Sequence, residues 1–191
     1  MSNIKEKNTM YRIGIDLGST TIKAVVIDDN GIIVYKCYTR HNAKIFETLH
    51  NVLKNIEKNI DASKATSIGV TGSVGMGIAE MCGTPFVQEV VAATKAIRHK
   101  GLTVSTMIDI GGEDAKIVFF GKDGKNEELR MNGNCSGGTG AFIDQMSIIL
   151  GESIEKMDSL AEKATKIYPI ASRCGVFCKT DIQNLIAKGA S

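Results

Sequence analysis

The stretch IDLGSTTIK, residues 15–23, sets a pattern that the chain uses twice. It joins an apolar run that ends in Asp16 to a second β-branched run through a glycine and hydroxyl residues, which predicts a β-hairpin. Alternation along the second strand places Ser19, Thr21 and Lys23 on one face. A glycine turn that presents backbone amides, with hydroxyls and a lysine beside it, could hold a phosphate group. Taken alone, the same string also fits a hairpin with an ordinary polar turn.

The residues around this stretch extend it to a meander of three strands over residues 11–38, RIGIDLG, TTIKAVVID and GIIVYKCY. The last two strands are joined at Asn30-Gly31, a strong hairpin signal because both residues tolerate positive φ. Apolar residues at helical spacing then predict a helix over residues 45–60, and TSIGVTG, residues 66–72, predicts a short buried strand. Two further helices are expected at about residues 77–81 and 87–99.

The same order of elements begins again near residue 103. The run VSTMIDIGGEDAKIVFFG, residues 104–121, predicts a strand, a glycine turn and a second strand. A third strand is expected near residues 127–131, after a turn at Asp123-Gly124. Helices are expected at about residues 139–150, 154–164 and 176–187.

This repeat predicts an α/β fold made of two ribonuclease-H-like units, residues 1–102 and 103–191. The first copy is expected to have closing strands at residues 66–72 and again before the restart. The second copy stops after its helices, so its unit is expected to be incomplete at the C-terminus.

The second glycine turn, DIGGED at residues 109–114, repeats the first because Asp109 ends an apolar strand as Asp16 does. An aspartate in this position is suited to hold Mg²⁺ through water, since the cation keeps several waters and takes only one or two carboxylates. Two such hairpins facing each other across a cleft would clamp a triphosphate and its metal, with Asp109 opposite Asp16. Glu113 and Asp114 could instead be solvated turn carboxylates.

Two cysteines lie at predicted helix entries. Cys135 sits in a glycine-rich turn before a helix, and Cys174 begins the last helix beside Arg173. Free amides, the helix dipole and local positive charge favour the thiolate there. A [4Fe–4S] cluster usually takes four thiolates, which two chains could supply; structural thiols or a zinc site are the alternatives. Cys178, one helical turn after Cys174, could be a third ligand or, as we expect, core packing.

The composition is that of an ordinary soluble globular protein, with 43% hydrophobic and 23% charged residues and a net charge of +2. The lack of a basic run argues against a nucleic-acid partner. Residues 1–10 lack the apolar stretch of a signal peptide, and no segment approaches the ~20 apolar residues of a membrane helix, so a cytoplasmic protein without a membrane partner is expected. The remaining cysteines and histidines are expected to be apolar fillers (Cys37 and Cys82) and surface residues (His41, His50 and His99).

Four segments together resemble known families. DLGSTT and DIGGED resemble the two phosphate motifs of the actin/hexokinase/Hsp70 superfamily, whose adenosine motif has no counterpart here. NGNCSGGTGAFIDQM, residues 132–146, and ASRCGVFCKTDI, residues 171–182, resemble the signature segments of activators of 2-hydroxyacyl-CoA dehydratases and of the related ATPase subunits of benzoyl-CoA reductases. The likeness spans residues 11–188. RCGVFCKTDIQNLI resembles the longer, fused members, of which this chain would be an N-terminal piece.

The resemblance implies a homodimer whose two-fold holds one [4Fe–4S] cluster through Cys135 and Cys174 of each subunit. It implies ATP and Mg²⁺ as cofactors, ferredoxin or flavodoxin as the electron donor, and a 2-hydroxyacyl-CoA dehydratase-type enzyme as the electron acceptor. ATP hydrolysis would be coupled to a swing of the cluster-bearing helices. Asp16 and Asp109 are then the expected residues for Mg²⁺ and water, and the expected nucleotide-binding residues are Gly18, Ser19, Thr20, Thr21, Lys23, Gly111, Gly112 and Glu113.

Two other functions share part of this pattern. A small-molecule kinase of the same superfamily would have both phosphate loops and, in addition, an acceptor-binding aspartate, which we do not find in the sequence. A non-catalytic metal-binding or redox-sensing module would use the cysteines alone. Iron and sulfide analysis separates these functions, because a kinase carries no cluster.

Overall fold

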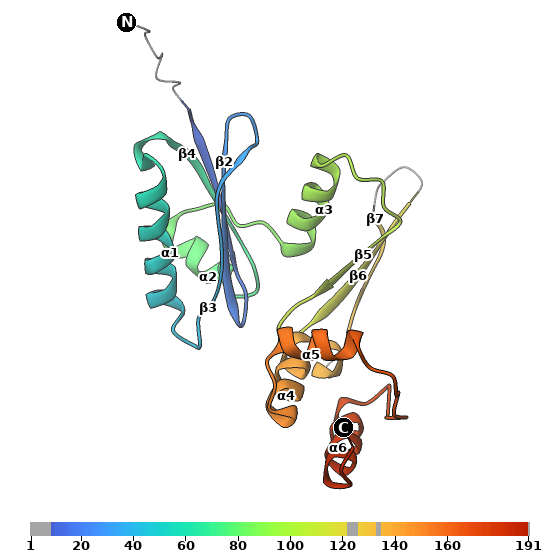
Figure 1. Cartoon of the computed structure of the whole chain (residues 1–191). Coiled ribbons are helices and arrows are strands. Elements are labelled where there is room, and N and C mark those ends of the chain that lie inside the picture. The colour runs from blue at the N-terminus through green and yellow to red at the C-terminus, as the bar shows by residue number, and fades with distance from the viewer. Residues whose placement is uncertain (1–8, 122–125, 133–134, 191) are drawn as a thin grey trace, which may run out of the picture. The chain divides into compact units, whose positions relative to one another are not determined.

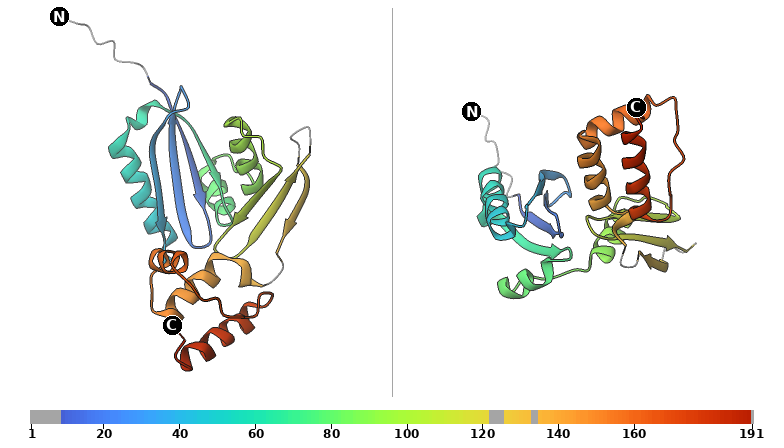
Figure 2. Two further views of the ribbon diagram at one scale, coloured as in Figure 1. Left: turned by 45° about the vertical axis from the view of Figure 1, so that its right-hand side comes forward. Right: turned by 90° about the horizontal axis from the view of Figure 1, so that it is seen from below.

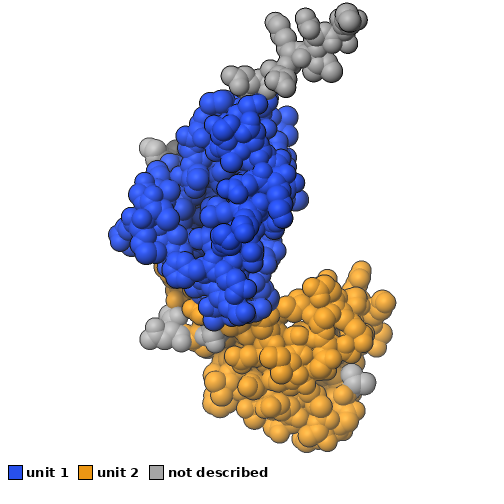
Figure 3. Space-filling model, turned by 90° about the vertical axis from the view of Figure 1, so that its left-hand side faces the viewer, with its two compact units in different colours: residues 1–102 blue, residues 103–191 orange. Residues whose placement is uncertain are grey.

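A computed structural model describes residues 9–121, 126–132 and 135–190. The chain divides into two compact units, residues 1–102 and 103–191, which are coloured separately in Figure 3. The turn expected at Asp123-Gly124 lies outside the described residues.

The first unit is built on a four-stranded sheet of order β3-β2-β1-β4. Its strands are β1 (Tyr11–Leu17), β2 (Thr21–Asp28), β3 (Ile33–Arg40) and β4 (Ala65–Thr71). The first three form an antiparallel meander, and β4 pairs in parallel with β1. The four predicted strands of this unit are therefore confirmed.

The β2–β3 turn forms at the predicted Asn30-Gly31. Gly31 has φ 78°, a left-handed conformation that glycine adopts without strain. The Asp28 carboxylate stabilises the turn because its Oδ1 accepts the backbone N–H groups of Asn30 at 2.9 Å and Ile32 at 2.8 Å.

Helices α1 (Ile45–Asn59) and α2 (Gly75–Cys82) pack on the sheet of this unit (Figure 1). Alternation along the strands turns one row of apolar side chains toward them. Ile15, Ile22 and Val26 are at most 5% exposed and pack in one cluster with residues of both helices, including Val52 and Ile78. The intervening strand residues, among them Asp16 and Lys23, therefore project from the opposite face.

The closing strand expected before the restart is not formed. The structure has instead a single parallel bridge between Val70 and Phe86, where Val70 donates to the Pro85 carbonyl and Val87 donates to the Val70 carbonyl. Helix α3 (Glu89–His99) follows almost at once. Pro85 lacks an N–H and the helix begins within a few residues, so the segment is too short to extend the pairing.

The second unit contains a three-stranded antiparallel sheet of order β5-β6-β7. Its elements are β5 (Thr106–Ile110), β6 (Ala115–Phe120), β7 (Asn126–Met131), α4 (Gly140–Leu150), α5 (Ile154–Glu162) and α6 (Gly175–Ala187), shown in yellow to red in Figure 2. All six predicted elements are present. Among the described helices of the chain, none has the length and apolar character needed to span a bilayer.

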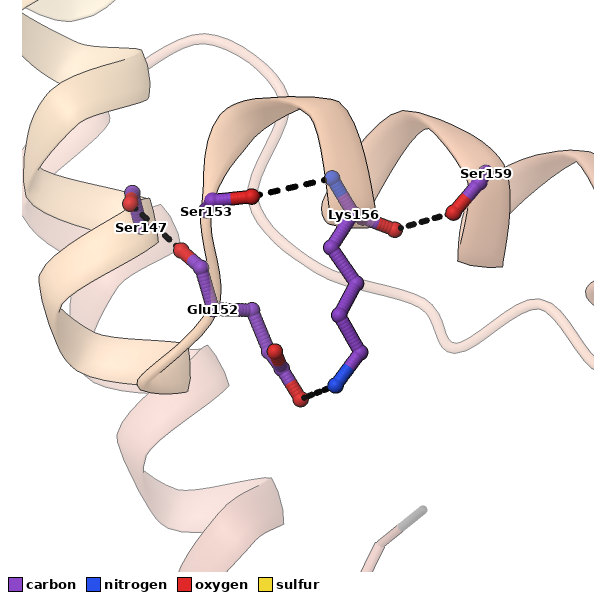
Figure 4. Close-up of polar contacts among 5 residues, drawn as sticks. All are labelled: Ser147, Glu152, Ser153, Lys156 and Ser159. Atoms are coloured by element: carbon purple, nitrogen blue, oxygen red, sulfur yellow. Dashed lines mark hydrogen bonds and ion pairs between the residues drawn. The ribbon is translucent and has the colours of Figure 1, made fainter.

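The α4–α5 junction is determined by local hydrogen bonds (Figure 4). Gly151 ends α4 in the left-handed conformation, and the Ser147 hydroxyl donates to the Glu152 carbonyl at 2.5 Å. The Ser153 hydroxyl caps α5 by accepting the Lys156 N–H, while the Lys156 ammonium lies 2.9 Å from the Glu152 carboxylate. These contacts explain why one helix ends and the next begins within a few residues.

Candidate functional site

The first hairpin loop places Asp16 and Lys23 side by side. The two residues are register partners on β1 and β2, and Lys23 Nζ lies 2.7 Å from Asp16 Oδ2. The loop between them is closed by the Gly18 N–H, which donates to the Thr21 carbonyl at 3.0 Å. Burial alone would lower the pKa of Lys23, but the hydrogen bond and charge of Asp16 outweigh it and the pKa is raised. Lys23 is therefore a fixed positive charge beside the loop.

The other carboxylate oxygen of Asp16, Oδ1, is buried. Among the described residues, Asp16 Oδ1 and the hydroxyl of Thr71 are buried without a hydrogen-bond partner. Thr71 is the register partner of Asp16 on β4. Gly72 follows with φ 94°, and a Cβ there would lie 2.5 Å from Asp16 Oδ1, so only glycine fits. A buried carboxylate oxygen without a protein partner is suited to accept a hydrogen bond from a metal-bound water.

These residues line a groove of about 580 Å³ in the first unit. The sheet contributes Asp16, Lys23 and Thr71 together with the small residue Gly69, and α3 contributes Ala92 among others. Thr71 was not among the site residues predicted from the sequence. The available signal was its place at the end of a buried strand, directly before a glycine, as Asp16 stands at the end of β1.

His41 is a correction, because it was expected on the surface. It is 5% exposed, and its ring Nε2 lies 3.2 Å from the Gly18 carbonyl of the first loop. His50 and His99 are exposed, as expected. No local pattern marked His41, since its partner lies 23 positions earlier in the chain.

The second hairpin loop repeats the first with a different ion pair. Asp109 and Lys116 are register partners on β5 and β6, at the same spacing as Asp16 and Lys23. Lys116 is 6% exposed, and its Nζ lies 2.7 Å from Asp114 Oδ2 at the end of the loop.

The rest of this loop closes around Asp114, because the Gly111 N–H donates to the Asp114 carbonyl at 2.8 Å. Asp114 is therefore an anchored residue, whereas Glu113 is exposed. Lys116 was missed by the sequence analysis, although its seven-residue distance from Asp109 equals that of Lys23 from Asp16.

The second loop is bonded directly to the start of α4. The Gly140 N–H donates to the Gly111 carbonyl and the Ala141 N–H to the Gly112 carbonyl, each at 2.9 Å. These are helix N-terminal amides, which have no partner within the helix itself. A Cβ on Gly140 would lie 3.2 Å from the Gly111 oxygen, a tight approach, so glycine at this position allows the contact without displacing the loop.

The two cysteine segments meet in the second unit. Cys135 precedes the short 3-10 helix η2 (Ser136–Gly138), and its sulfur accepts the Gly137 N–H at 3.4 Å. Cys174 is the residue before α6. A Cβ on Gly175 would lie 2.9 Å from Gly137 Cα, so backbone packs on backbone. The structure therefore brings together two cysteine-bearing turns that lie far apart in the sequence.

The remaining thiols have other environments. Cys178 is 9% exposed, in accordance with the packing role expected for it, and Cys37 packs against the core of the first unit. Cys82 is exposed, so its expected role as an apolar filler is wrong. It lies in the last turn of the short helix α2, which leaves it outside the core.

In the part of the chain that the structure describes, no three His, Cys, Asp or Glu side chains gather to hold a metal ion.

The whole chain is similar to proteins of known function. The chain is 30% identical over 185 residues to the activator of lactoyl-CoA dehydratase from Anaerotignum propionicum, covering 95% of this chain and 70% of that protein. It is 29% identical to the (R)-2-hydroxyglutaryl-CoA dehydratase activating ATPase of Acidaminococcus fermentans, covering 95% of this chain and 69% of that protein.

The fold and the family of the chain follow from two further similarities. The crystal structure of component A of the Acidaminococcus fermentans (R)-2-hydroxyglutaryl-CoA dehydratase superposes with a TM-score of 0.81 at 28% identity, over 95% of this chain and 70% of that one. Its similarity establishes a mixed α/β fold of the activator type. The model of the BadF/BadG/BcrA/BcrD ATPase family matches residues 13–191, so the chain belongs to that family.

Proposed function

We propose that this chain is an ATP-dependent activator that passes single electrons from a [4Fe–4S] cluster to an enzyme of the 2-hydroxyacyl-CoA dehydratase type. The family is one of ATPases, and the relatives are named as a dehydratase activator and an activating ATPase. The partners in this proposal are a second copy of the chain, a dehydratase-type enzyme, and ferredoxin or flavodoxin as the electron donor. The proposed location is the cytoplasm.

In this proposal the hairpin loops bind the phosphates of ATP. Asp16 fits a role toward Mg²⁺, because its Oδ1 has no hydrogen-bond partner among the described residues. Asp109 occupies the equivalent register position on β5. Bound Mg²⁺ supplies charge neutralisation of the phosphates, and the chain orients them. The proposed nucleotide-binding residues are Gly18, Ser19, Thr20, Thr21, Lys23, Gly111, Gly112 and Glu113.

The two cysteine-bearing turns, which pack on each other, support a cluster that two chains share. Cys174 precedes α6, where the positive end of the helix dipole favours a thiolate, and Cys135 lies in the turn packed against it. Each chain offers two thiols at this place, so a cluster with four thiolate ligands requires a second copy. The cluster, when bound, supplies a one-electron redox centre.

The observation that carries the proposal is the short backbone connection between the second loop and the cysteines. The loop carbonyls of Gly111 and Gly112 bind the first amides of α4, and the Cys135 turn runs directly into that helix. A loop that adopts different positions with ATP and with ADP would therefore move the Cys135 turn. Such coupling requires that the two nucleotides bind the two conformations with different affinity.

The proposal is tested by iron and sulfide analysis of protein purified and reconstituted without oxygen. We expect about one [4Fe–4S] cluster per two chains, and we expect Cys135→Ala and Cys174→Ala each to abolish it. Cys178→Ala is the matched control, because this buried thiol packs in the core and is expected to leave the cluster intact. Cluster loss in the Cys178 variant to the same extent would contradict the ligand assignment.

The same measurement separates the alternative functions. A small-molecule kinase would bind ATP and contain no iron. A metal-binding module without ATPase activity would contain iron and show no ATP turnover.

A further inference from the structure

The first hairpin loop is held from one side by His41, the residue after β3. Its backbone N–H donates to the Thr20 carbonyl at 3.2 Å, and its ring Nε2 lies 3.2 Å from the Gly18 carbonyl. The side chain is buried at 5% exposure. One residue therefore contacts two carbonyls of the loop, once through its backbone and once through its ring.

The ring is held in one tautomer by its own turn. The Ala43 N–H donates to His41 Nδ1 at 3.2 Å, so Nδ1 is the acceptor nitrogen and the proton resides on Nε2. The Nε2–H group then donates to the Gly18 carbonyl. Asn42 and Ala43 have φ 47° and 63°, a conformation that residues with a side chain seldom adopt. This uncommon turn is what directs the Ala43 N–H at the ring.

The contact determines the orientation of the Gly18–Ser19 peptide. In a trans peptide the C=O and the following N–H point in opposite directions, and the described backbone has no cis bond. Because the Gly18 carbonyl points at His41, the Ser19 N–H points away from it. Backbone amides in a glycine turn are the groups that bind phosphate oxygens in anion-binding loops.

We propose that His41 is a positioning residue, which fixes the Gly18–Ser19 peptide so that the Ser19 N–H binds a phosphate of the nucleotide. The proposal rests on the proposed function, since it assumes that the first loop binds MgATP. His41 acts through the loop and does not contact the nucleotide. Its side chain therefore contributes to phosphate affinity from behind the loop.

Two substitutions separate positioning from simple support of the fold. Asn in place of His41 keeps an oxygen that can accept the Ala43 N–H, but it is too short to reach the Gly18 carbonyl. Gln can extend its amide N–H₂ to the place of Nε2 and donate to that carbonyl. We expect His41→Asn to bind MgATP about tenfold more weakly than the unsubstituted chain, and His41→Gln to stay within about threefold of it.

Calorimetric titration with MgATP measures the affinities, and thermal unfolding of the same samples measures stability. Amide spectra of ¹⁵N-labelled protein give a direct signature, in which MgATP shifts the Ser19 resonance in the unsubstituted chain and in His41→Gln but not in His41→Asn. His50→Ala, at an exposed position on α1, is the matched control and is expected to bind normally.

The outcomes are distinguishable. If the Asn and Gln variants bind MgATP equally, with the same Ser19 shift, His41 has no positioning role and the proposed function is unaffected. If the unsubstituted chain binds no MgATP, the proposed function fails and this inference fails with it.

Discussion

The two hairpin loops begin alike and are supported differently. Each has an aspartate on its first strand and a lysine seven residues later on its second, and in both hairpins these two are register partners. In the first loop Lys23 pairs with Asp16 itself, and the loop is held by His41. In the second loop the lysine is more deeply buried and pairs with Asp114, at the end of the loop.

The two loops are also bonded to different structural elements. The first loop is held from β3 within its own sheet, whereas the second is bonded through its glycine carbonyls to α4. The comparison shows that one repeated hairpin can be held by different neighbouring residues in its two copies. We infer that the first loop is built mainly to bind, and the second to bind and also to transmit a change to the cysteine turn.

The largest expected effect concerns the two aspartates. Asp16→Ala and Asp109→Ala should each lower ATP turnover at least ~10²-fold, because a group that holds the metal or stabilises charge is lost from the transition state. Phosphate release by the purified chain measures this. A decrease with Asp16→Ala alone would break the equivalence of the two loops, and unchanged turnover in both would remove both residues from the site.

A smaller effect is expected from the two lysines, and it should differ between the units. Lys116→Met leaves the Asp114 carboxylate, whose side chain is 40% exposed, without this ion-pair partner and should lower the free energy of unfolding by roughly 1–3 kcal/mol. Lys23→Met should cost less than about 1 kcal/mol, because the side chain of Lys23 is 38% exposed and its ion pair is screened by water. Urea unfolding followed by circular dichroism compares the two variants; equal losses would mean that the burial difference has no energetic consequence.

The smallest expected effect concerns the first glycine of each loop. A Cβ on Gly111 would lie 2.5 Å from Asp114 Oδ1, whereas a Cβ on Gly18 would meet nothing nearer than the Thr21 carbonyl at 3.4 Å. Gly111→Ala should therefore destabilise the chain by about 1 kcal/mol more than Gly18→Ala. Thermal unfolding of the two variants measures the difference. A larger loss of stability with Gly18→Ala would contradict the closer packing that we describe around Gly111.

The sequence by itself determined nearly all the elements of both units, and it predicted the chemistry of the two loops and the two cysteine turns. Strand alternation, helical apolar spacing and the Asn30-Gly31 turn depend on neighbouring residues, so the predicted helices and strands were found close to their expected bounds. The fifth strand of the first unit was wrong, because strand pairing depends on a partner and on the room left before α3. The expected nucleotide-binding residues remain predictions until binding is measured.

Only the tertiary structure decided which distant residues meet. The packing of Gly137 on Gly175 joins the two cysteine turns, and the ring of His41 reaches the Gly18 carbonyl across 23 residues. The pairing of Lys116 with Asp114 likewise depends on side-chain direction and burial. These contacts follow from how strands and helices pack against one another, and the local propensities that make each element readable in a sequence contain no information about that packing.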